Sequence, residues 1–229
     1  MANKRKDPGK TMEPATLYGA EYSVYTRLAR LVLEEAGVPH GLVEVDVFSD
    51  SGLPPEYLAK QPFGKIPAFE HDGFHLFETD AIAQYVIDVS GRRNLMPDGI
   101  RDRARATQIM RIMDNHGYRS MVWGVFVEEV ERDRRGLLTM DEIDRARDVL
   151  AVLAGLMGQP FLVGERVTLA DLWTAPMIAY LRLAPTGAAL LGEFPALESW
   201  WGHMATRPSI MATRYPMEIN AAGKKGGAA

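Results

Sequence analysis

The chain has 229 residues, of which 47% are hydrophobic and 24% charged, the composition of an ordinary globular protein with one large or two modest domains. Its formal net charge of −4 gives no basic footprint for nucleic acid, so we expect no nucleic-acid partner. The sequence contains no cysteine, which excludes disulfides, thiolate metal sites and any mechanism that uses a thiol of the protein itself.

The apolar runs and the two ends of the chain bear on its location. No apolar run reaches the roughly 18 residues of a membrane span, and the segment that starts at Met1 lacks the apolar core of a secretory signal. We therefore expect a cytoplasmic protein with no membrane partner. Residues 1–14 and 217–229 are polar or rich in Gly, Ala and Lys, which predicts two flexible tails.

The first part of the chain alternates between strand and helix patterns. Gly37 follows an amphipathic run, where a helix commonly ends, and Asp72-Gly73 is typical of a hairpin turn. The order β-α-β-α-β-β-α, with a proline at the start of the third strand, predicts a thioredoxin-like α/β domain over residues 15–91. The expected elements lie at residues 15–19 (strand), 23–37 (helix), 41–47 (strand), 55–61 (helix), 65–71 (strand), 74–78 (strand) and 79–90 (helix).

Strand patterns nearly vanish in the second part of the chain. Gly, Pro and Asp interrupt the regular pattern, so we place a linker at residues 92–99 and an all-helical bundle at residues 100–216. The stretch TLADL is a capping-box variant in which Asp171 returns a hydrogen bond to the helix start, and we interpret it as structural. The expected helices lie at residues 100–135, 140–158, 169–184 and 195–207.

Two common kinds of site find no support in the sequence. The five histidines show no metal-ligand spacing such as HxxxH, so we expect no metal site. Neither G-x-x-x-x-G-K-[ST] nor a strand-linked G-x-G-x-x-G is present, so a nucleotide cofactor is not expected.

One stretch contains an internal contradiction. In QPFGKIPAFEHDG, which begins at Gln61, the residues after Lys65 read as a short buried strand although Pro67 stands inside it. Proline has no N–H to give to a strand ladder. Either the strand is absent, or the interruption has a purpose.

Four stretches match one protein family, in that family's order. They read LYGAEYSVYTRLARLVLEEAG, KQPFGKIPAFEHDGFHLFETDAIAQYV, FLVGERVTLADL and FPALESWWGHMATRPS, and together they span residues 16–208. The chain resembles the cytosolic glutathione S-transferases, most closely the phi- and theta-like classes with an active-site serine. The resemblance implies a thioredoxin-like domain that binds glutathione as co-substrate, an all-helical C-terminal domain (the glutathione S-transferase fold), and a homodimer.

The resemblance gives Pro67 a purpose. A proline at the start of an edge strand can hold a cis peptide, which costs only about 0.5–1 kcal/mol relative to trans and turns the preceding N–H and C=O outward. In the family, the residue before this proline pairs with the cysteinyl backbone of glutathione, a form of strand addition. The implied roles are backbone pairing for Ile66 and the cis position for Pro67.

Further glutathione contacts are implied by position. In FETDAI, Glu78 and Thr79 stand where the family has Glu-Ser, the pair that holds the γ-glutamyl end. Thr79 keeps the hydroxyl and can cap the helix, whose N-terminus suits a carboxylate. Lys65 suits the glycyl carboxylate. His40 occupies a place where related enzymes sometimes contact that group, although a role outside the site is the favoured interpretation for His40.

Catalysis by such a site requires ionisation of a thiol. A free thiol with a pKa near 8.5 is only about 3% ionised at pH 7, and lowering that pKa by one to two units raises the fraction to roughly 25–75%. Ser23 lies fourteen residues before Gly37, the spacing seen around the serine of the phi-like class. Its hydroxyl can donate to the thiolate without a general base.

Alternatives to Ser23 remain open in this loop. Ser23 can be a simple N-cap, and Tyr18, Tyr22 and Tyr25 compete for the catalytic role because other classes of the family use a tyrosine here. The family's proline is absent, and Glu21 stands near its place with an unexpected negative charge.

The acceptor substrate is less defined than glutathione. A mostly apolar cleft is expected between the loop of the first helix and the long helix beginning near Ile100. Met113, His116, Gly117 and Met121 are candidate lining residues, although each also reads as ordinary helix core or surface.

The most direct interpretation is conjugation of glutathione to a hydrophobic electrophile, as in detoxification. The alternatives are glutathione-dependent peroxide reduction, dehalogenation or isomerisation on the same fold, or a glutathione-binding or protein-interaction module without turnover.

Overall fold

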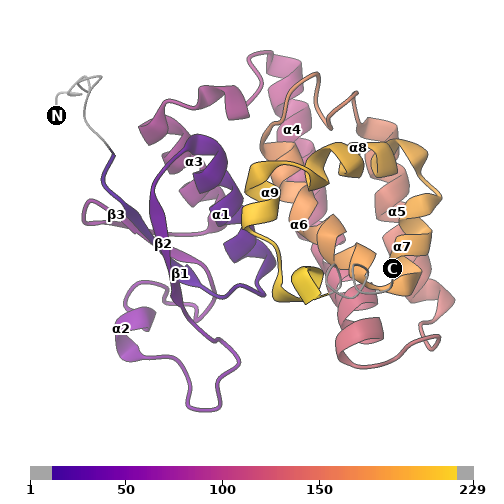
Figure 1. The fold of residues 1–229 in the computed structure, drawn as a ribbon, viewed down its shortest axis with the longest axis horizontal. Coiled ribbons are helices and arrows are strands. Elements are labelled where there is room, and N and C mark those ends of the chain that lie inside the picture. Colours follow the sequence, from indigo (N-terminus) through magenta and orange to yellow (C-terminus); the bar gives the residue numbers. More distant parts are fainter. Residues whose placement is uncertain (1–11, 221–229) are drawn as a thin grey trace, which may run out of the picture. The chain divides into compact units, whose positions relative to one another are not determined.

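The computed structural model describes residues 12–220, and the chain divides into two compact units between Arg92 and Arg93 (Figure 1).

The first unit is a four-stranded mixed sheet with helices. Its elements are β1 (Ala15–Gly19), α1 (Val24–Ala36), β2 (His40–Glu44), α2 (Pro55–Leu58), β3 (Ala68–His71), β4 (Phe74–Phe77) and α3 (Thr79–Ser90). The strand order is β2-β1-β3-β4, with β1 and β2 parallel and β3 antiparallel to both of its neighbours. This arrangement confirms the predicted thioredoxin-like fold.

Successive side chains of β1 point to opposite faces of the sheet, and their contacts show which helices cover each face. Leu17 is paired with Phe69 of β3, and both are buried; the Phe69 ring meets the Tyr85 ring of α3 at 5.9 Å. Tyr18 points to the other face, where its ring lies 6.5 Å from that of Tyr57 in α2. Helices α1 and α3 pack together, so the core of the unit lies between them and the sheet (Figure 1).

Local turn chemistry closes the elements as expected. The Asp72-Gly73 turn joins β3 to β4 with φ of 50° and 72°, a left-handed pair that Asp and Gly tolerate best. Ser23 is the N-cap of α1, and Gly37 is its left-handed C-cap.

The expectation that the strand after Pro67 lies at the edge of the sheet is wrong. Ala68 is paired with Tyr18 of β1 on one side and with Phe77 of β4 on the other. The hairpin partner β4 covers the side that would otherwise be open, so β2 and β4 form the edges. Pro67 lies outside this pairing, immediately before its first residue.

The two expected tails fall largely on residues 1–11 and 221–229, which lie outside the described residues. The described parts of both are attached to the fold. The Glu13 carbonyl accepts a hydrogen bond from Nε2 of His71 at 3.1 Å. Residues 216–220 are helical, and the Glu218 carboxylate accepts the N–H of Tyr215 at 2.9 Å. The second tail therefore begins with helix, because a proline at position 216 and this acidic cap both favour a helix start.

Every regular element of the second unit within its described residues is a helix. Helix α6 lies at its centre and is buried nearly all round, as its apolar sequence requires. The expected linker contains the short 3₁₀ helix η1, and α7 and α9 were not expected. The elements are η1 (Arg93–Leu95), α4 (Ile100–Ile112), η2 (Met113–Glu131), α5 (Met140–Leu156), α6 (Leu169–Leu183), α7 (Pro185–Gly192), α8 (Pro195–Ala205) and α9 (Pro208–Ala212).

The single helix expected over residues 100–135 is two helices of different winding. The α-helix α4 ends at Ile112, and η2 continues it as a π-helix to Glu131. The wider turn is visible at its end, where the N–H of Arg132 donates to the carbonyl of Val127, five residues back, at 2.9 Å. The spacing of apolar residues in the sequence, about one every four residues, fits both an α-helix and a π-helix, so it could not distinguish the two.

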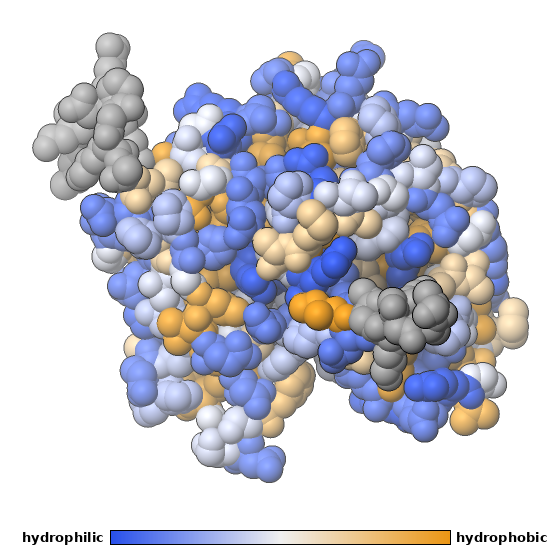
Figure 2. Space-filling view, in the orientation of Figure 1, coloured by the Kyte–Doolittle hydropathy of each residue, from blue (hydrophilic) through white to orange (hydrophobic). Residues whose placement is uncertain are grey.

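No helix within residues 12–220 is long and apolar enough to cross a membrane. Figure 2 shows a face on which hydrophilic residues predominate and apolar residues appear in small groups between them.

Candidate functional site

Sheet topology brings three sequence-distant segments to one end of the first unit. Tyr18, near the end of β1, is paired with Ala68, the first residue of β3. Ala68 is in turn paired with Phe77, the last residue of β4. The chain therefore leaves β1, enters β3 and leaves β4 at the same end of the sheet, which we call the site edge. The predicted residues Ser23, Ile66 with Pro67, and Glu78 with Thr79 all follow or precede these strand ends.

Ser23 combines two roles in one hydroxyl. Its Oγ accepts the N–H of Thr26 at 3.2 Å and so caps α1. Accepting this bond uses a lone pair and leaves the hydroxyl proton available, and no acceptor for that proton is found among residues 12–220. N-capping and donation to a ligand are therefore compatible at Ser23, which is half-buried.

A close approach between β1 and α1 fixes where this helix begins. A methyl group at Gly19 would lie 2.3 Å from Oγ1 of Thr26, so only glycine allows the strand end to pass this closely. The turn that follows is closed by a hydrogen bond from the N–H of Ser23 to the carbonyl of Ala20 at 3.0 Å.

Of the three competing tyrosines, two donate their hydroxyl to a carboxylate and the third lies within helix α1. Tyr18 donates its hydroxyl to Glu70 at 3.1 Å on the α2 face of the sheet, and the ammonium of Lys60 lies 4.9 Å from its ring centre. Tyr22 donates to Asp46 at 3.1 Å, and burial together with that carboxylate raises the pKa of Tyr22 to about 12. Tyr25 lies in the first turn of α1 and is half-buried.

Three acidic residues surround this loop. Glu21 is exposed and lies 3.9 Å from the guanidinium of Arg30. Desolvation, followed by repulsion from Glu21 and Asp46, raises the pKa of Glu44. Negative charge here favours the neutral form of any acid bound nearby.

The segment directly before β3 has backbone groups that are not paired with a strand. The Ile66–Pro67 peptide is cis, and the residues that precede Ala68 have no strand partner. Lys65 is exposed, and its ammonium has no ion-pair partner in the part of the chain that the structure describes.

The helix start after β4 has an unusual backbone. Glu78 is the N-cap of α3 and has φ 69° and ψ 117°, which is rare for a residue other than glycine. The expectation that Thr79 caps the helix is therefore wrong: Thr79 is the first helical residue and is buried. Backbone strain of this kind costs on the order of 1–3 kcal/mol and is concentrated at functional sites.

His40 does not join the site edge. It is paired with Ala15 at the opposite end of the parallel strands β1 and β2, four residues or roughly 13 Å from the site edge. Its ring is within 3.0 Å of the Val38 carbonyl and 3.8 Å of the Glu34 carboxylate. The structure therefore does not bring His40 together with the other predicted glutathione contacts, which agrees with the favoured interpretation of His40 as a residue outside the site.

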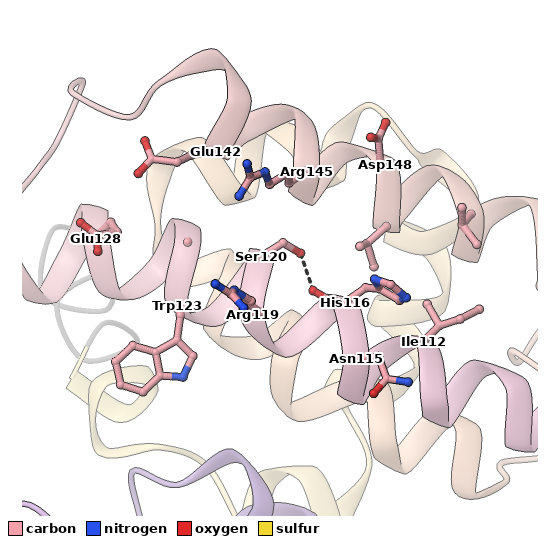
Figure 3. Close-up of a pocket in the computed structure, with 13 residues that line it drawn as sticks. Ile112, Asn115, His116, Arg119, Ser120, Trp123, Glu128, Glu142, Arg145 and Asp148 are labelled. Carbon is pink, nitrogen blue, oxygen red and sulfur yellow. Dashed lines mark hydrogen bonds between the residues drawn. The ribbon is translucent and has the colours of Figure 1, made fainter.

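The four candidate acceptor residues do not share a cavity. Met113 and Met121 are buried, and a methyl group at Gly117 would lie 2.7 Å from one and 3.2 Å from the other, so these three pack together. Of the four, His116 lines a groove of about 670 Å³ between η2 and α5, and the other three are not among the residues that line this groove (Figure 3).

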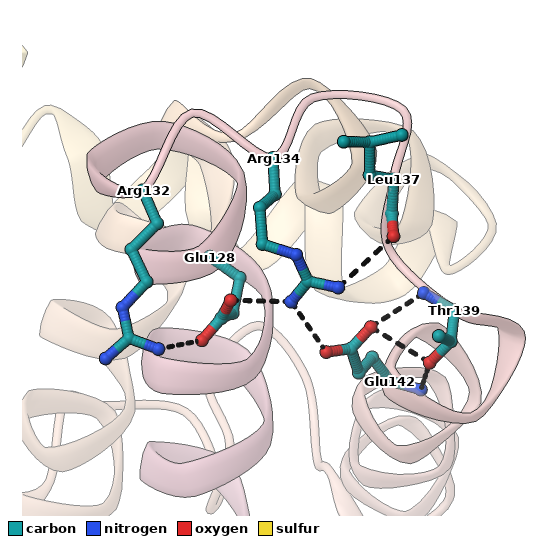
Figure 4. Close-up of polar contacts among 6 residues, drawn as sticks. All are labelled: Glu128, Arg132, Arg134, Leu137, Thr139 and Glu142. Atoms are coloured by element: carbon teal, nitrogen blue, oxygen red, sulfur yellow. Dashed lines mark hydrogen bonds and ion pairs between the residues drawn. The ribbon is translucent and has the colours of Figure 1, made fainter.

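Two carboxylates that line this groove form ion pairs with arginines that do not line it. Glu128 forms ion pairs with Arg132 and Arg134, and Arg134 also reaches Glu142 of the capping box that begins α5 (Figure 4). These bonds fasten the loop between η2 and α5.

Two site-edge residues were not expected from the sequence. Tyr57 and Gln61 are buried and both hydrogen-bond to the backbone of Lys65. No local sequence pattern marks either residue, because their burial depends on packing against neighbours distant in sequence. No cluster of three or more metal-ligating side chains occurs among residues 12–220.

Comparison with known proteins gives one consistent family. Residues 17–93 match the family described as the glutathione S-transferase N-terminal domain, and residues 134–208 match the glutathione S-transferase C-terminal domain. Glutathione S-transferase 4 from Zea mays is 30% identical over 216 residues, covering 91% of this chain and 96% of the relative. A probable glutathione S-transferase from Oryza sativa subsp. japonica is 29% identical over 208 residues, covering 87% of this chain and 94% of the relative.

A solved structure extends this result to the fold. The crystal structure of glutathione transferase F7 from Populus trichocarpa superposes with a TM-score of 0.73 at 27% identity, covering 87% of this chain and 97% of that one. The sequence match covers both units and nearly the whole length of these relatives. The chain belongs to the glutathione S-transferase family.

Proposed function

We propose that this protein conjugates glutathione to electrophilic small molecules by a serine-type mechanism in which the hydroxyl of Ser23 stabilises the glutathione thiolate. The observation that carries the proposal is the hydroxyl proton of Ser23, which is uncommitted at the N-terminus of α1, whereas Tyr18 and Tyr22 have given theirs to carboxylates. Because the sequence has no cysteine, the reacting thiol must belong to the ligand.

The proposed reaction has two steps, ionisation of the thiol and attack by the thiolate. The thiol of bound glutathione loses its proton to solvent, and the Ser23 hydroxyl donates a hydrogen bond to the resulting thiolate, which lowers the thiol pKa. The positive end of the α1 dipole acts in the same direction. The thiolate then attacks an electrophilic carbon, a carbon–sulfur bond forms, and the leaving group departs with its electron pair.

The remaining site-edge residues hold the tripeptide. The N–H and C=O of Ile66, next to Pro67, pair with the cysteinyl backbone of glutathione. The Glu78 carboxylate meets the γ-glutamyl ammonium, while the Thr79 hydroxyl and the N-terminus of α3 accommodate the γ-glutamyl carboxylate. Lys65 supplies a cation for the glycyl carboxylate. The strained backbone of Glu78 supports this assignment, since such strain typically persists where a ligand contact requires it.

Membership of the family supports the wider setting of this proposal. The protein forms a homodimer, acts in the cytoplasm and contributes to detoxification of hydrophobic electrophiles. A solution mass equal to that of one 25.4 kDa chain would contradict the dimer.

The decisive experiment compares wild type with Ser23→Ala, Ser23→Gly and Ser23→Thr in conjugation to a chloronitrobenzene, with glutathione binding measured by calorimetry. Glycine costs only a few tenths of a kcal/mol at an N-cap, so Ser23→Gly removes the hydroxyl with little loss of helix stability. At pH 7 we expect kcat to fall roughly 10- to 25-fold in the Ala and Gly variants, because the bound thiol returns toward a pKa near 8.5. Ser23→Thr should retain most of the rate.

A matched control is Ser90→Ala, which deletes a serine hydroxyl bonded to the Ile87 carbonyl at the far end of α3. Turnover by Ser23→Gly at the wild-type rate would remove Ser23 from the mechanism. Binding without conjugation in wild type, across a panel that includes peroxides and haloalkanes, would instead favour a module without turnover.

A further inference from the structure

The backbone of Lys65, directly before the proposed pairing residue Ile66, is held from both sides by buried side chains. Oε1 of Gln61 accepts the N–H of Phe63 at 2.8 Å and the N–H of Lys65 at 3.3 Å. The hydroxyl of Tyr57 donates to the carbonyl oxygen of Lys65. Tyr57 is 4% exposed and Gln61 2% exposed, so the side chains that make these bonds are largely shielded from bulk water.

The direction of the Ile66 N–H follows from this arrangement. The Lys65–Ile66 peptide is not among the cis bonds of the chain, and in a trans peptide the C=O and N–H point in opposite directions. Because Tyr57 holds the Lys65 C=O toward the interior, the Ile66 N–H must point away from Tyr57. The Lys65–Ile66 peptide plane therefore cannot rotate without breaking the hydrogen bond from the Tyr57 hydroxyl.

Tyr57 is itself firmly placed. Its carbonyl accepts the N–H of Gln61 at 2.9 Å, so the two holding residues are linked through the backbone. Lys60, between them, forms an ion pair with Glu70 of β3 at 2.8 Å, which ties the end of α2 to the sheet. Burial raises the pKa of Tyr57 to about 12, so its hydroxyl remains a donor across the working pH range.

We propose that Tyr57 and Gln61 are positioning residues for glutathione: they touch no substrate, but they orient the Lys65–Ile66 peptide so that the Ile66 N–H meets the cysteinyl backbone of the tripeptide. This role rests on the proposed function of the site edge. It also explains why two polar side chains are buried under an exposed loop.

The test uses Tyr57→Phe, which keeps the buried ring and removes only the hydroxyl, and Gln61→Met, which keeps the length of the side chain and removes the acceptor. In each variant we expect the Kd and the KM for glutathione to rise roughly fivefold to tenfold. The KM for the acceptor and kcat at saturating glutathione should change less than about twofold, because Ser23 is untouched. In the ligand-free protein, amide exchange in residues 61–67 should accelerate.

The matched control is Tyr85→Phe, which deletes a hydroxyl bonded to Nδ1 of His71 at 2.8 Å, at the hairpin end of the sheet away from the site edge. It should lower the melting temperature as Tyr57→Phe does and leave glutathione binding unchanged. Wild-type affinity in both Tyr57→Phe and Gln61→Met, or an equal affinity loss in Tyr85→Phe, would overturn the positioning role and leave the proposed function standing. Failure of the wild type to bind glutathione would overturn both.

Discussion

Around the first helix, what a side chain can do depends on which bond it has already made. Tyr18 and Tyr22 each donate to a carboxylate, whereas Ser23 accepts from the backbone and keeps its proton. The sequence alone suggested all three as donors, because spacing locates a hydroxyl but does not reveal its partner. Glu70 and Asp46, which engage the two tyrosines, lie 52 and 24 residues away in the chain.

Glu21 should make the proposed thiolate harder to form. An exposed charge at about 10 Å in water contributes about 0.4 kcal/mol, or roughly 0.3 of a pKa unit. We therefore expect Glu21→Gln to lower the pKa of the bound glutathione thiol by that amount and to raise the conjugation rate at pH 6.5 up to about twofold, with no change at pH 9. The measurement is kcat against pH. Glu56→Gln, an exposed change in α2, is the control, and a thiol pKa that rises in Glu21→Gln would contradict the argument.

At the scale of elements, sequence patterns located most helices and strands but not their interruptions. The helix at residues 79–90 and the Asp72-Gly73 hairpin follow from local chemistry alone, and the structure confirms both. The site edge was placed largely by resemblance, since the pairing of β1, β3 and β4 is not local. The winding of η2 and the burial of Gln61 were missed because both depend on packing against neighbours distant in sequence.

The capping box of α6 shows how a local motif can acquire long-range partners. Asp171 is buried and accepts hydrogen bonds from the N–H and hydroxyl of Thr168, as the sequence predicts. It also accepts the N–H of Leu162 at 2.9 Å and the indole N–H of Trp200 at 2.8 Å. This one carboxylate therefore joins a loop, the start of α6 and helix α8.

Replacement of Asp171 by Ala should cost more than an ordinary cap, which is worth about 0.5–2 kcal/mol. Four buried donors would lose their acceptor, so we expect about 3 kcal/mol of destabilisation and a melting temperature lower by roughly 6–12 °C. Thermal denaturation measures this, and Asp171→Asn, which keeps one acceptor oxygen, should fall between Ala and wild type.

The control for this prediction is Thr139→Ala at the exposed capping box of α5, where we expect a loss of only about 1 kcal/mol. If Asp171→Ala and Thr139→Ala lowered the melting temperature equally, the bonds to Leu162 and Trp200 would contribute nothing measurable.

On the scale of the whole molecule, hydrogen-bonded glutamates are spread over both units, and each should contribute less to the stability of the fold as the pH falls. Hydrogen bonds from cationic or backbone donors lower the pKa of four glutamates. Two other carboxyls, Glu44 and Asp171, have pKa values raised by desolvation and act in the opposite direction. The four are Glu70 with Lys60, Glu128 with Arg134, Glu142 with Thr139, and Glu193 with Arg147.

The sign of the pH dependence follows from these directions. A carboxyl whose pKa is lower in the folded state stabilises the fold above its unfolded pKa, about 4.3 for Glu, and loses that contribution as the pH falls through the folded value. With four groups lowered and two raised, we expect the melting temperature to be nearly level from pH 7 to 5 and to fall between pH 4.5 and 3.

Differential scanning calorimetry across this range, at low and high salt, tests the argument. Exposed pairs are screened by salt, so the acid loss should be smaller at 1 M NaCl. Glu128→Gln removes one titrating group and should flatten the curve below pH 4.5 while lowering the melting temperature at pH 7. A melting temperature that stays level to pH 3, or an acid loss unaffected by both salt and Glu128→Gln, would show that the ion pairs around η2 and α5 do not contribute to stability. Because Asp171 takes up its proton more readily when folded, Asp171→Asn should instead steepen the loss, which separates the two opposing sets of carboxyls in a single series.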